Sequence, residues 1–209
     1  MISDEFNKIS HFDMKEGQIA LSKRNVILAE TVFNILNRNS SLENDIKTLV
    51  SNYSAESLDT LCKTINAENS THLREHERKA IVKMILNQCK DINSFKKRLK
   101  DKNYALVYDI RALKESYENR NTIRANYSFA TKFCHYSCYY LFKDDKSRDL
   151  YPIYDSVISD YVKKSIVYKN SKNRDLNDYK NYVNIIDEII KDKEISRNGF
   201  DHLIWLVYR

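Results

Sequence analysis

Glycine and proline are scarce in this chain, and that scarcity limits the folds it can adopt. Only two glycines and one proline occur among its 209 residues. Sheets joined by tight turns need more of both, because glycine supplies left-handed backbone conformations and proline presets a turn angle. Apolar residues also recur at intervals of three and four along nearly the whole chain, as in amphipathic helices. We therefore predict an all-α fold of about nine or ten helices with no strand pair.

The sequence carries no sign of a membrane segment. No window approaches 18 uncharged apolar residues, and the first residues, Met1-Ile2-Ser3-Asp4-Glu5, are acidic where a signal peptide would be basic. The four cysteines form no Cys-x-x-Cys pair, so we expect free, partly buried thiols in a reducing compartment. These features predict a cytoplasmic protein with no membrane partner.

The charge of the chain is compatible with an anionic partner. The formal net charge is +6, and basic residues cluster at Lys96–Lys102 and again at Lys163–Arg174. Fifteen tyrosines offer aromatic faces on which bases could stack, although biased codon usage would also enrich tyrosine. Charge and aromatic content thus permit nucleic-acid binding without requiring it.

Several helix boundaries can be predicted from local chemistry. Ser54 and Asp91 are suited to cap the helices that follow them, because their side-chain oxygens can accept from free backbone N–H groups. Pro152 fits the first turn of a later helix, where its missing N–H costs nothing. Asn198 and Gly199 are expected to separate a helix over residues 176–191 from a final helix over residues 200–208.

Two patterns resemble metal sites, and we expect neither to bind metal. His72-Leu73-Arg74-Glu75-His76 matches a zinc-protease spacing, but the pattern is short and a solvated helix start explains it better. On a helix, Cys134 and Cys138 would share a face while His135 points about 100° away from Cys134, so buried thiols are the simpler interpretation. No glycine-rich phosphate loop is present, and no cofactor is expected.

Lys132 and Asp155 could perform chemistry together, or could each have an ordinary role. An unprotonated lysine can form an imine, which requires burial or a nearby positive field. Asp155 follows the single proline by three residues, so a rigid turn would fix its direction. The alternative roles are a solvated or phosphate-binding lysine and an aspartate at a helix start. Residue chemistry alone favours those alternatives.

Three stretches of the chain carry a further signal: Ser128-Phe129-Ala130-Thr131-Lys132, Tyr151-Pro152-Ile153-Tyr154-Asp155-Ser156 and Phe200-Asp201-His202-Leu203-Ile204-Trp205. Together they resemble the helix-hairpin-helix DNA glycosylase superfamily, in particular bacterial proteins with the 8-oxoguanine DNA glycosylase fold. The resemblance covers residues 120–209. It implies a two-lobed helical fold, with an unassigned lobe over residues 1–100 and a glycosylase-like core over residues 101–209.

The resemblance also implies an activity and a set of site residues. Lys132 would attack the sugar C1′ of a flipped nucleotide, and Asp155 would stabilise the positive charge or move a proton, giving a base-excision hydrolase with possible lyase activity. Aromatic side chains would stack on the extruded base, and basic ones would bind DNA phosphates. The stacking candidates are Tyr136, Tyr139 and Trp205; the phosphate-binding candidates are Arg120, Arg124, Lys163 and Lys164.

A second hypothesis keeps the fold without the activity. Hairpins of that superfamily bring glycine N–H groups against a DNA phosphate, and residues 124–131 contain no glycine. The chain could then be a non-catalytic module that binds nucleic acid or protein. A regulatory or phage-defence protein from a mobile element, with a protein target, is a third possibility.

Overall fold

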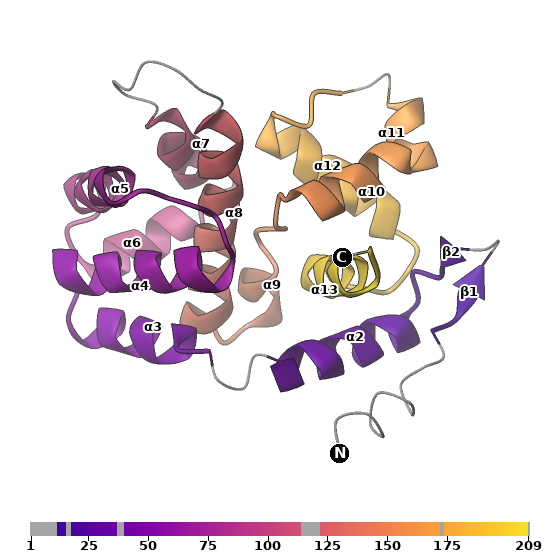
Figure 1. The fold of residues 1–209 in the computed structure, drawn as a ribbon, viewed down its shortest axis with the longest axis horizontal. Coiled ribbons are helices and arrows are strands. Elements are labelled where there is room, and N and C mark those ends of the chain that lie inside the picture. The colour runs from indigo at the N-terminus through magenta and orange to yellow at the C-terminus, as the bar shows by residue number, and fades with distance from the viewer. Residues whose placement is uncertain (1–11, 16–17, 37–39, 114–121, 172–173, 209) are drawn as a thin grey trace. The chain divides into compact units, whose positions relative to one another are not determined.

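The computed structural model describes residues 12–15, 18–36, 40–113, 122–171 and 174–208 (Figure 1). These residues form twelve helices, α2 to α13, and one sheet of two short strands. The all-α class is therefore confirmed. Within the same residues, no helix combines the length and the apolar character needed to cross a membrane.

The chain divides into two compact units. Unit 1 comprises Met1–Asn39, Ser156–Leu176 and Asn181–Arg209, and unit 2 comprises Ser40–Asp155 and Asn177–Lys180. Unit 1 is thus built from both ends of the chain, whereas unit 2 is nearly continuous in sequence. The predicted division at residue 100 falls inside unit 2, between two of its helices.

Unit 2 is arranged around one long helix, α8 (Figure 1). Helices α3, α4, α6, α7 and α9 all contact α8, and α5 contacts α4. Phe129, Phe133, Cys134 and Cys138 of α8 are completely buried, so this helix forms the centre of the core. The helices of unit 2 are α3 (Leu42–Ser51), α4 (Ala55–Glu68), α5 (Glu75–Gln88), α6 (Ile92–Leu99), α7 (Ala105–Ala112), α8 (Thr122–Leu141) and α9 (Asp145–Arg148).

The two N-caps predicted for unit 2 are confirmed. Ser54 Oγ accepts from the backbone N–H of Ser57 at 3.3 Å, and the Ser57 hydroxyl accepts from the Ser54 N–H in return. Asp91 accepts from the N–H of Ser94 at 2.7 Å, with the same reciprocal bond. Both caps satisfy N–H groups that have no partner inside the helix.

Unit 1 is held together by the packing of α13 against α2, with α10 against α13. Its core contains Ile19, Val26, Ala29 and Leu203. The elements are β1 (Met14–Lys15), β2 (Gln18–Ile19), α2 (Lys23–Leu36), α10 (Ser156–Lys164), α11 (Ile166–Asn170), α12 (Tyr179–Ile190) and α13 (Arg197–Tyr208). The first two residues of α12 are grouped with unit 2.

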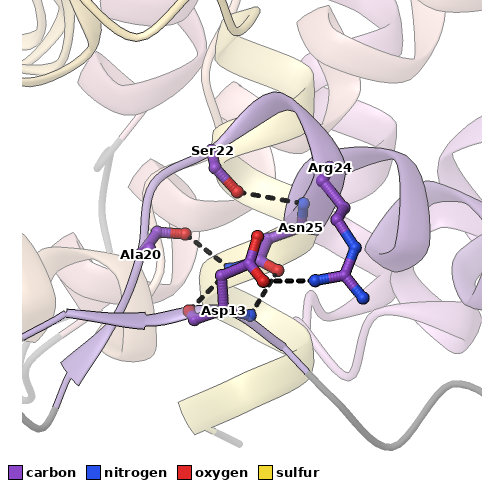
Figure 2. Close-up of polar contacts among 5 residues, drawn as sticks. All are labelled: Asp13, Ala20, Ser22, Arg24 and Asn25. Atoms are coloured by element: carbon purple, nitrogen blue, oxygen red, sulfur yellow. Dashed lines mark hydrogen bonds and ion pairs between the residues drawn. The ribbon is translucent and has the colours of Figure 1, made fainter.

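Asn25 joins the strand pair to the start of α2 (Figure 2). Its amide nitrogen donates to the carbonyls of Asp13 and Ala20 at 2.9 and 2.8 Å, and its amide oxygen accepts from the Asp13 N–H at 2.8 Å. Asp13 also forms an ion pair with Arg24. Asn25 is completely buried, and these three bonds use most of its hydrogen-bonding capacity.

Three predictions about boundaries are wrong. A strand pair exists, because β1 and β2 pair antiparallel; each has two residues, too few for alternation to be visible in the sequence. Asn198 and Gly199 lie inside the first turn of α13 instead of before it. Pro152 lies in the loop before α10, which begins at Ser156, so it is not in the first helical turn.

Candidate active site

Lys132 lies midway along α8, on a side of the helix that is largely shielded from water. Its side chain is 9% exposed. His135, Tyr136 and Tyr139 follow at intervals of three, four and seven residues, so all four side chains lie on one helical face. The segment expected to form a hairpin before Lys132, residues 124–131, is helical and belongs to α8.

His135 is a neutral, buried imidazole that faces the loop leading to Asp155. Its Nδ1–H donates to the carbonyl of Tyr151 at 2.8 Å, which fixes the tautomer. Burial lowers the pKa of His135 to about 4, and the charge of nearby Lys132 acts in the same direction against the opposing effect of this hydrogen bond. His135 is therefore uncharged near neutral pH and serves as a hydrogen-bond donor to the loop.

Hydrogen bonds from other segments of unit 2 hold the loop of residues 151–155 in place. Besides the bond from His135, the Tyr179 hydroxyl donates to the Pro152 carbonyl at 2.7 Å. The backbone N–H of Tyr154 donates to Thr131 Oγ1 at 3.0 Å. Because Thr131 precedes Lys132 and Tyr154 precedes Asp155, the last bond brings the two segments that carry the predicted pair together.

Aromatic contacts reinforce the end of this loop. The rings of Tyr154 and Tyr127 lie 4.2 Å apart between centroids, and the guanidinium of Arg111 lies 4.5 Å from the Tyr127 ring centre. Tyr151 is fully buried and donates its hydroxyl to the Leu99 carbonyl at 2.8 Å. The backbone that presents Asp155 is therefore fixed by packing as well as by hydrogen bonds.

Asp155 is half-buried and directly precedes the first residue of α10. That is the position at which a helix start favours an aspartate, through its free N–H groups and its dipole. A role at the helix start and a role in chemistry are compatible, because a carboxylate held there keeps a defined direction. The structure thus leaves both of the sequence-based interpretations of Asp155 in place.

The three predicted base-stacking residues have different surroundings. Tyr136 is 9% exposed and donates its hydroxyl to Asn69 Oδ1 at 2.9 Å. Tyr139 is half-buried, and the guanidinium of Arg148 lies 4.0 Å from its ring centre. Trp205 is half-buried on α13 and belongs to unit 1. Tyr136 and Tyr139 thus lie on the face of α8 that carries Lys132, and Trp205 comes from the other unit.

The predicted phosphate-binding residues also belong to both units. Lys163 and Lys164 are exposed at the end of α10 in unit 1, and Lys163 lies 3.4 Å from Asp160. Arg120 lies outside the described residues. Arg124 belongs to α8, and its side chain is likewise outside the described part.

Neither candidate metal pattern forms a site within the described residues, where no group of three or more potential ligands comes together. His72 has a left-handed backbone (φ 55°) and lies in the loop before α5, so it shares no helical face with His76. Cys134 and Cys138 are completely buried, and burial raises the pKa of both thiols. Both are protonated near neutral pH.

Sequence reasoning did not assign roles to Thr131, His135 and Tyr179, which anchor the loop. Their partners lie 23, 16 and 27 residues away in the sequence, so no local pattern could connect them. The one available signal was the placement of a histidine three residues after Lys132 on a helix, which puts both side chains on one face.

The fold and the site together define the class of protein: it is all-α, with a buried lysine on a central helix and an anchored loop beside that helix. Residues 21–141 match the model of the HI_0787_N family, which is described as an N-terminal domain. The match covers more than half of the 209 residues, and the chain belongs to this family. No curated protein and no solved structure matches the chain.

The family match divides the candidate site. It begins just before α2 and ends at the last residue of α8, so it includes Thr131, Lys132 and His135. Asp155 and its loop lie beyond it, in residues 142–209. The pairing of Lys132 with Asp155 therefore combines the family domain with the segment that follows it.

Proposed function

We propose that this protein is a DNA-binding base-excision glycosylase in which Lys132 and Asp155 act together, through an imine that also permits lyase activity. The observation that carries the proposal is the hydrogen bond between Thr131 and Tyr154, which brings the neighbours of the two residues together within unit 2. The low exposure of Lys132 adds support, because lysines withdrawn from water are those recruited as nucleophiles.

The proposed reaction begins with an unprotonated Lys132. Its nitrogen forms a bond to the sugar C1′ while the bond from C1′ to the base breaks, and the base leaves with the bonding electrons and takes up a proton from solvent. The nitrogen then loses a proton, and its lone pair forms a double bond to C1′ while the bond from C1′ to the ring oxygen breaks; the ring oxygen takes up a proton from solvent, and the product is an open-chain sugar joined to Lys132 as a protonated imine. Asp155 stabilises the positive charge that develops at C1′. No metal or cofactor takes part in this scheme.

The proposed substrate is duplex DNA with a damaged or modified base. Extrusion of the nucleotide would expose its C1′, and Tyr136 or Tyr139, on the face of α8 that carries Lys132, would stack on the base. Lys163, Lys164, Arg120 and Arg124 would bind phosphates, so affinity would fall steeply as salt rises. The net charge of +6 is consistent with this partner.

Reductive trapping tests the proposal. The protein is incubated with a panel of duplexes, each with one modified base, in the presence of sodium borohydride, which reduces the imine to a stable covalent adduct. We expect an adduct with at least one duplex, lost in Lys132→Ala and weakened in Asp155→Asn. Lys143→Ala is the matched control, because Lys143 is an exposed lysine just beyond the same helix. Equal trapping by Lys132→Ala and the parent would refute the assignment.

A second candidate function is a non-catalytic module that binds nucleic acid or protein. It is favoured by residues 124–131, which form part of α8 and contain no glycine, so they do not provide the glycine N–H groups of a phosphate-binding hairpin. Salt-sensitive DNA binding without an adduct on any duplex would support the module. A stable protein complex that is insensitive to salt would support a regulatory or defence role.

A further inference from the structure

The corner between α10 and α11 exposes an apolar side chain. Ile166, the first residue of α11, is 74% exposed, more than any other large hydrophobic residue in the part of the chain that the structure describes. Lys169 and Asn170 are also exposed, and their spacing of three and four residues places them on the same face of α11. Val167 and Tyr168, on the other side, are half-buried.

The surroundings of Ile166 are cationic. Lys163 and Lys164 precede it at the end of α10, and Lys169 follows it, all three exposed. No acidic residue occurs between Tyr161 and Ser171. Lys163 lies 3.4 Å from Asp160, while no ion pair within the described residues engages Lys164 or Lys169. An exposed apolar side chain is thus flanked in the sequence by exposed lysines, of which Lys164 and Lys169 are available to a polyanion.

The corner is also held in a defined conformation. Ser165 Oγ accepts from the N–H of Tyr168 at 3.2 Å and donates to the carbonyl of Val162 at 2.7 Å. One serine thus caps the start of α11 and closes the end of α10. Because the turn is fixed before any partner binds, little conformational entropy would be lost when Ile166 is buried.

We propose that this corner, residues 163–170, is a DNA-binding surface in which Ile166 inserts between neighbouring base pairs while Lys164 and Lys169 contact phosphates. Proteins that bend DNA insert single apolar side chains, isoleucine among them, into base steps from the minor groove and surround them with cationic and amide groups. Asn170, on the same face, supplies an amide that can reach base edges. The inference rests on the proposed DNA binding and adds a contact surface in unit 1.

A membrane surface is the alternative partner for an exposed apolar residue among lysines, and the size of the apolar contact argues against it. Even a myristoyl chain binds a bilayer only marginally by itself, and an interfacial helix needs a long apolar face. One isoleucine on a helix of five residues provides neither. In DNA the apolar residue only has to separate one base step, since phosphate contacts supply most of the affinity.

The experiment uses the full chain and a duplex whose single modified base is 2-aminopurine, whose fluorescence rises when the base is unstacked. Binding and fluorescence are measured for the parent, Ile166→Ala and Lys164→Ala at several salt concentrations. The control is Ile27→Ala, which removes an isoleucine that is 53% exposed on α2 of the same unit. Binding to vesicles rich in phosphatidylserine is measured in parallel.

We expect Ile166→Ala to bind about tenfold more weakly at every salt concentration and to lose the fluorescence rise, because only an apolar contact is removed. Lys164→Ala should instead make the DNA affinity less sensitive to salt, by about the amount that one phosphate contact contributes to the slope of log affinity against log salt concentration. Ile27→Ala should match the parent. Unchanged unstacking in Ile166→Ala, or Ile166-dependent binding to vesicles in place of DNA, would overturn the proposal.

The same samples separate this inference from the proposed catalysis. Lys132→Ala should lose the borohydride adduct on a modified duplex and keep the Ile166-dependent unstacking. If the parent unstacks DNA but forms no borohydride adduct with any duplex, the proposed glycosylase activity is rejected and the proposed DNA-binding surface at residues 163–170 is kept. If the parent forms the adduct and Ile166→Ala does not alter unstacking, the proposed DNA-binding surface is rejected and the proposed glycosylase activity is kept.

Discussion

The contact between α2 and α13 should fail if Gly199 acquires a side chain. A Cβ at this position would lie 2.4 Å from Val26 Cγ1 and 3.1 Å from Ser196 Oγ. Carbon atoms pack at about 3.5 Å or more, so the first contact is too short by roughly 1 Å. Val26 is 5% exposed and β-branched, with one strongly preferred helical rotamer, and it packs in the core of unit 1. The helices must therefore separate.

The expected cost of Gly199→Ala is the difference between two effects. Overpacking a core costs about 1–3 kcal/mol, while replacing glycine by alanine in a helix contributes up to about 1 kcal/mol of stability. We expect the free energy of unfolding to fall by about 1–2 kcal/mol. Val26→Ala alone should cost about 2 kcal/mol by loss of burial, and the double variant should lose clearly less than the sum, because the new methyl occupies the space vacated by Val26 Cγ1.

Fluorescence of Trp205 is a direct assay for this prediction. It is the single tryptophan of the chain and lies on α13, so a urea titration followed at this probe reports on unit 1 even if the two units unfold separately. A Gly199→Ala variant as stable as the parent would refute the reasoning. So would strict additivity in the double variant, because it would mean that the added methyl and Val26 do not meet.

Other predictions concern the anchored loop and a charged contact in unit 2. Thr131→Val should cost about 1–3 kcal/mol by leaving the Tyr154 N–H without its acceptor, and Thr131→Ser should restore most of the loss in the same denaturation assay. The pKa of His135 is about 4 in the folded protein, against 6.5 for an ordinary histidine, so the unfolded chain binds more protons between these two pH values. The stability that depends on neutral His135, on the order of 3 kcal/mol, should therefore be fully present above about pH 6.5 and be lost as the pH falls to 4. His135→Asn, which keeps a donor for the Tyr151 carbonyl, should show a weaker pH dependence in that window; an unchanged profile would contradict the assignment. Arg78→Met should cost about 1–3 kcal/mol by removing the largely buried partner that lies 2.5 Å from Asp59, and equal stability of the variant and the parent would show that Lys63 alone suffices.

The features that the sequence predicted correctly are local ones. The helical class follows from spacing and from the lack of glycine and proline, and the caps at Ser54 and Asp91 depend on atoms only three residues apart. The same local reasoning failed at Gly199, where glycine was interpreted as a helix break. It is needed inside α13 because Val26, far away in the sequence, lies against it. Turn preference and close packing favour the same residue for different reasons.

The candidate site could be predicted only as a pair of positions. Lys132 and Asp155 were identified by resemblance, but the bonds that hold their segments together start from Thr131, His135 and Tyr179 and reach partners 16 to 27 residues away. Such contacts depend on how α8 and the loop pack against each other. The spacing of apolar residues in the sequence does not contain that information. The burial of Lys132 has the same origin, since an isolated amphipathic pattern does not show which polar residue the core will enclose.

The most direct test of the account is to locate the trapped DNA on the protein. After borohydride reduction with the modified duplex that traps best, the complex is digested with nuclease and protease, and the peptide that carries the reduced sugar is sequenced by mass spectrometry. The account predicts a sugar remnant on Lys132 and on no other lysine, with a lower yield from Asp155→Asn. A remnant on another lysine or on the N-terminal amine, with Lys132 unmodified, would contradict it.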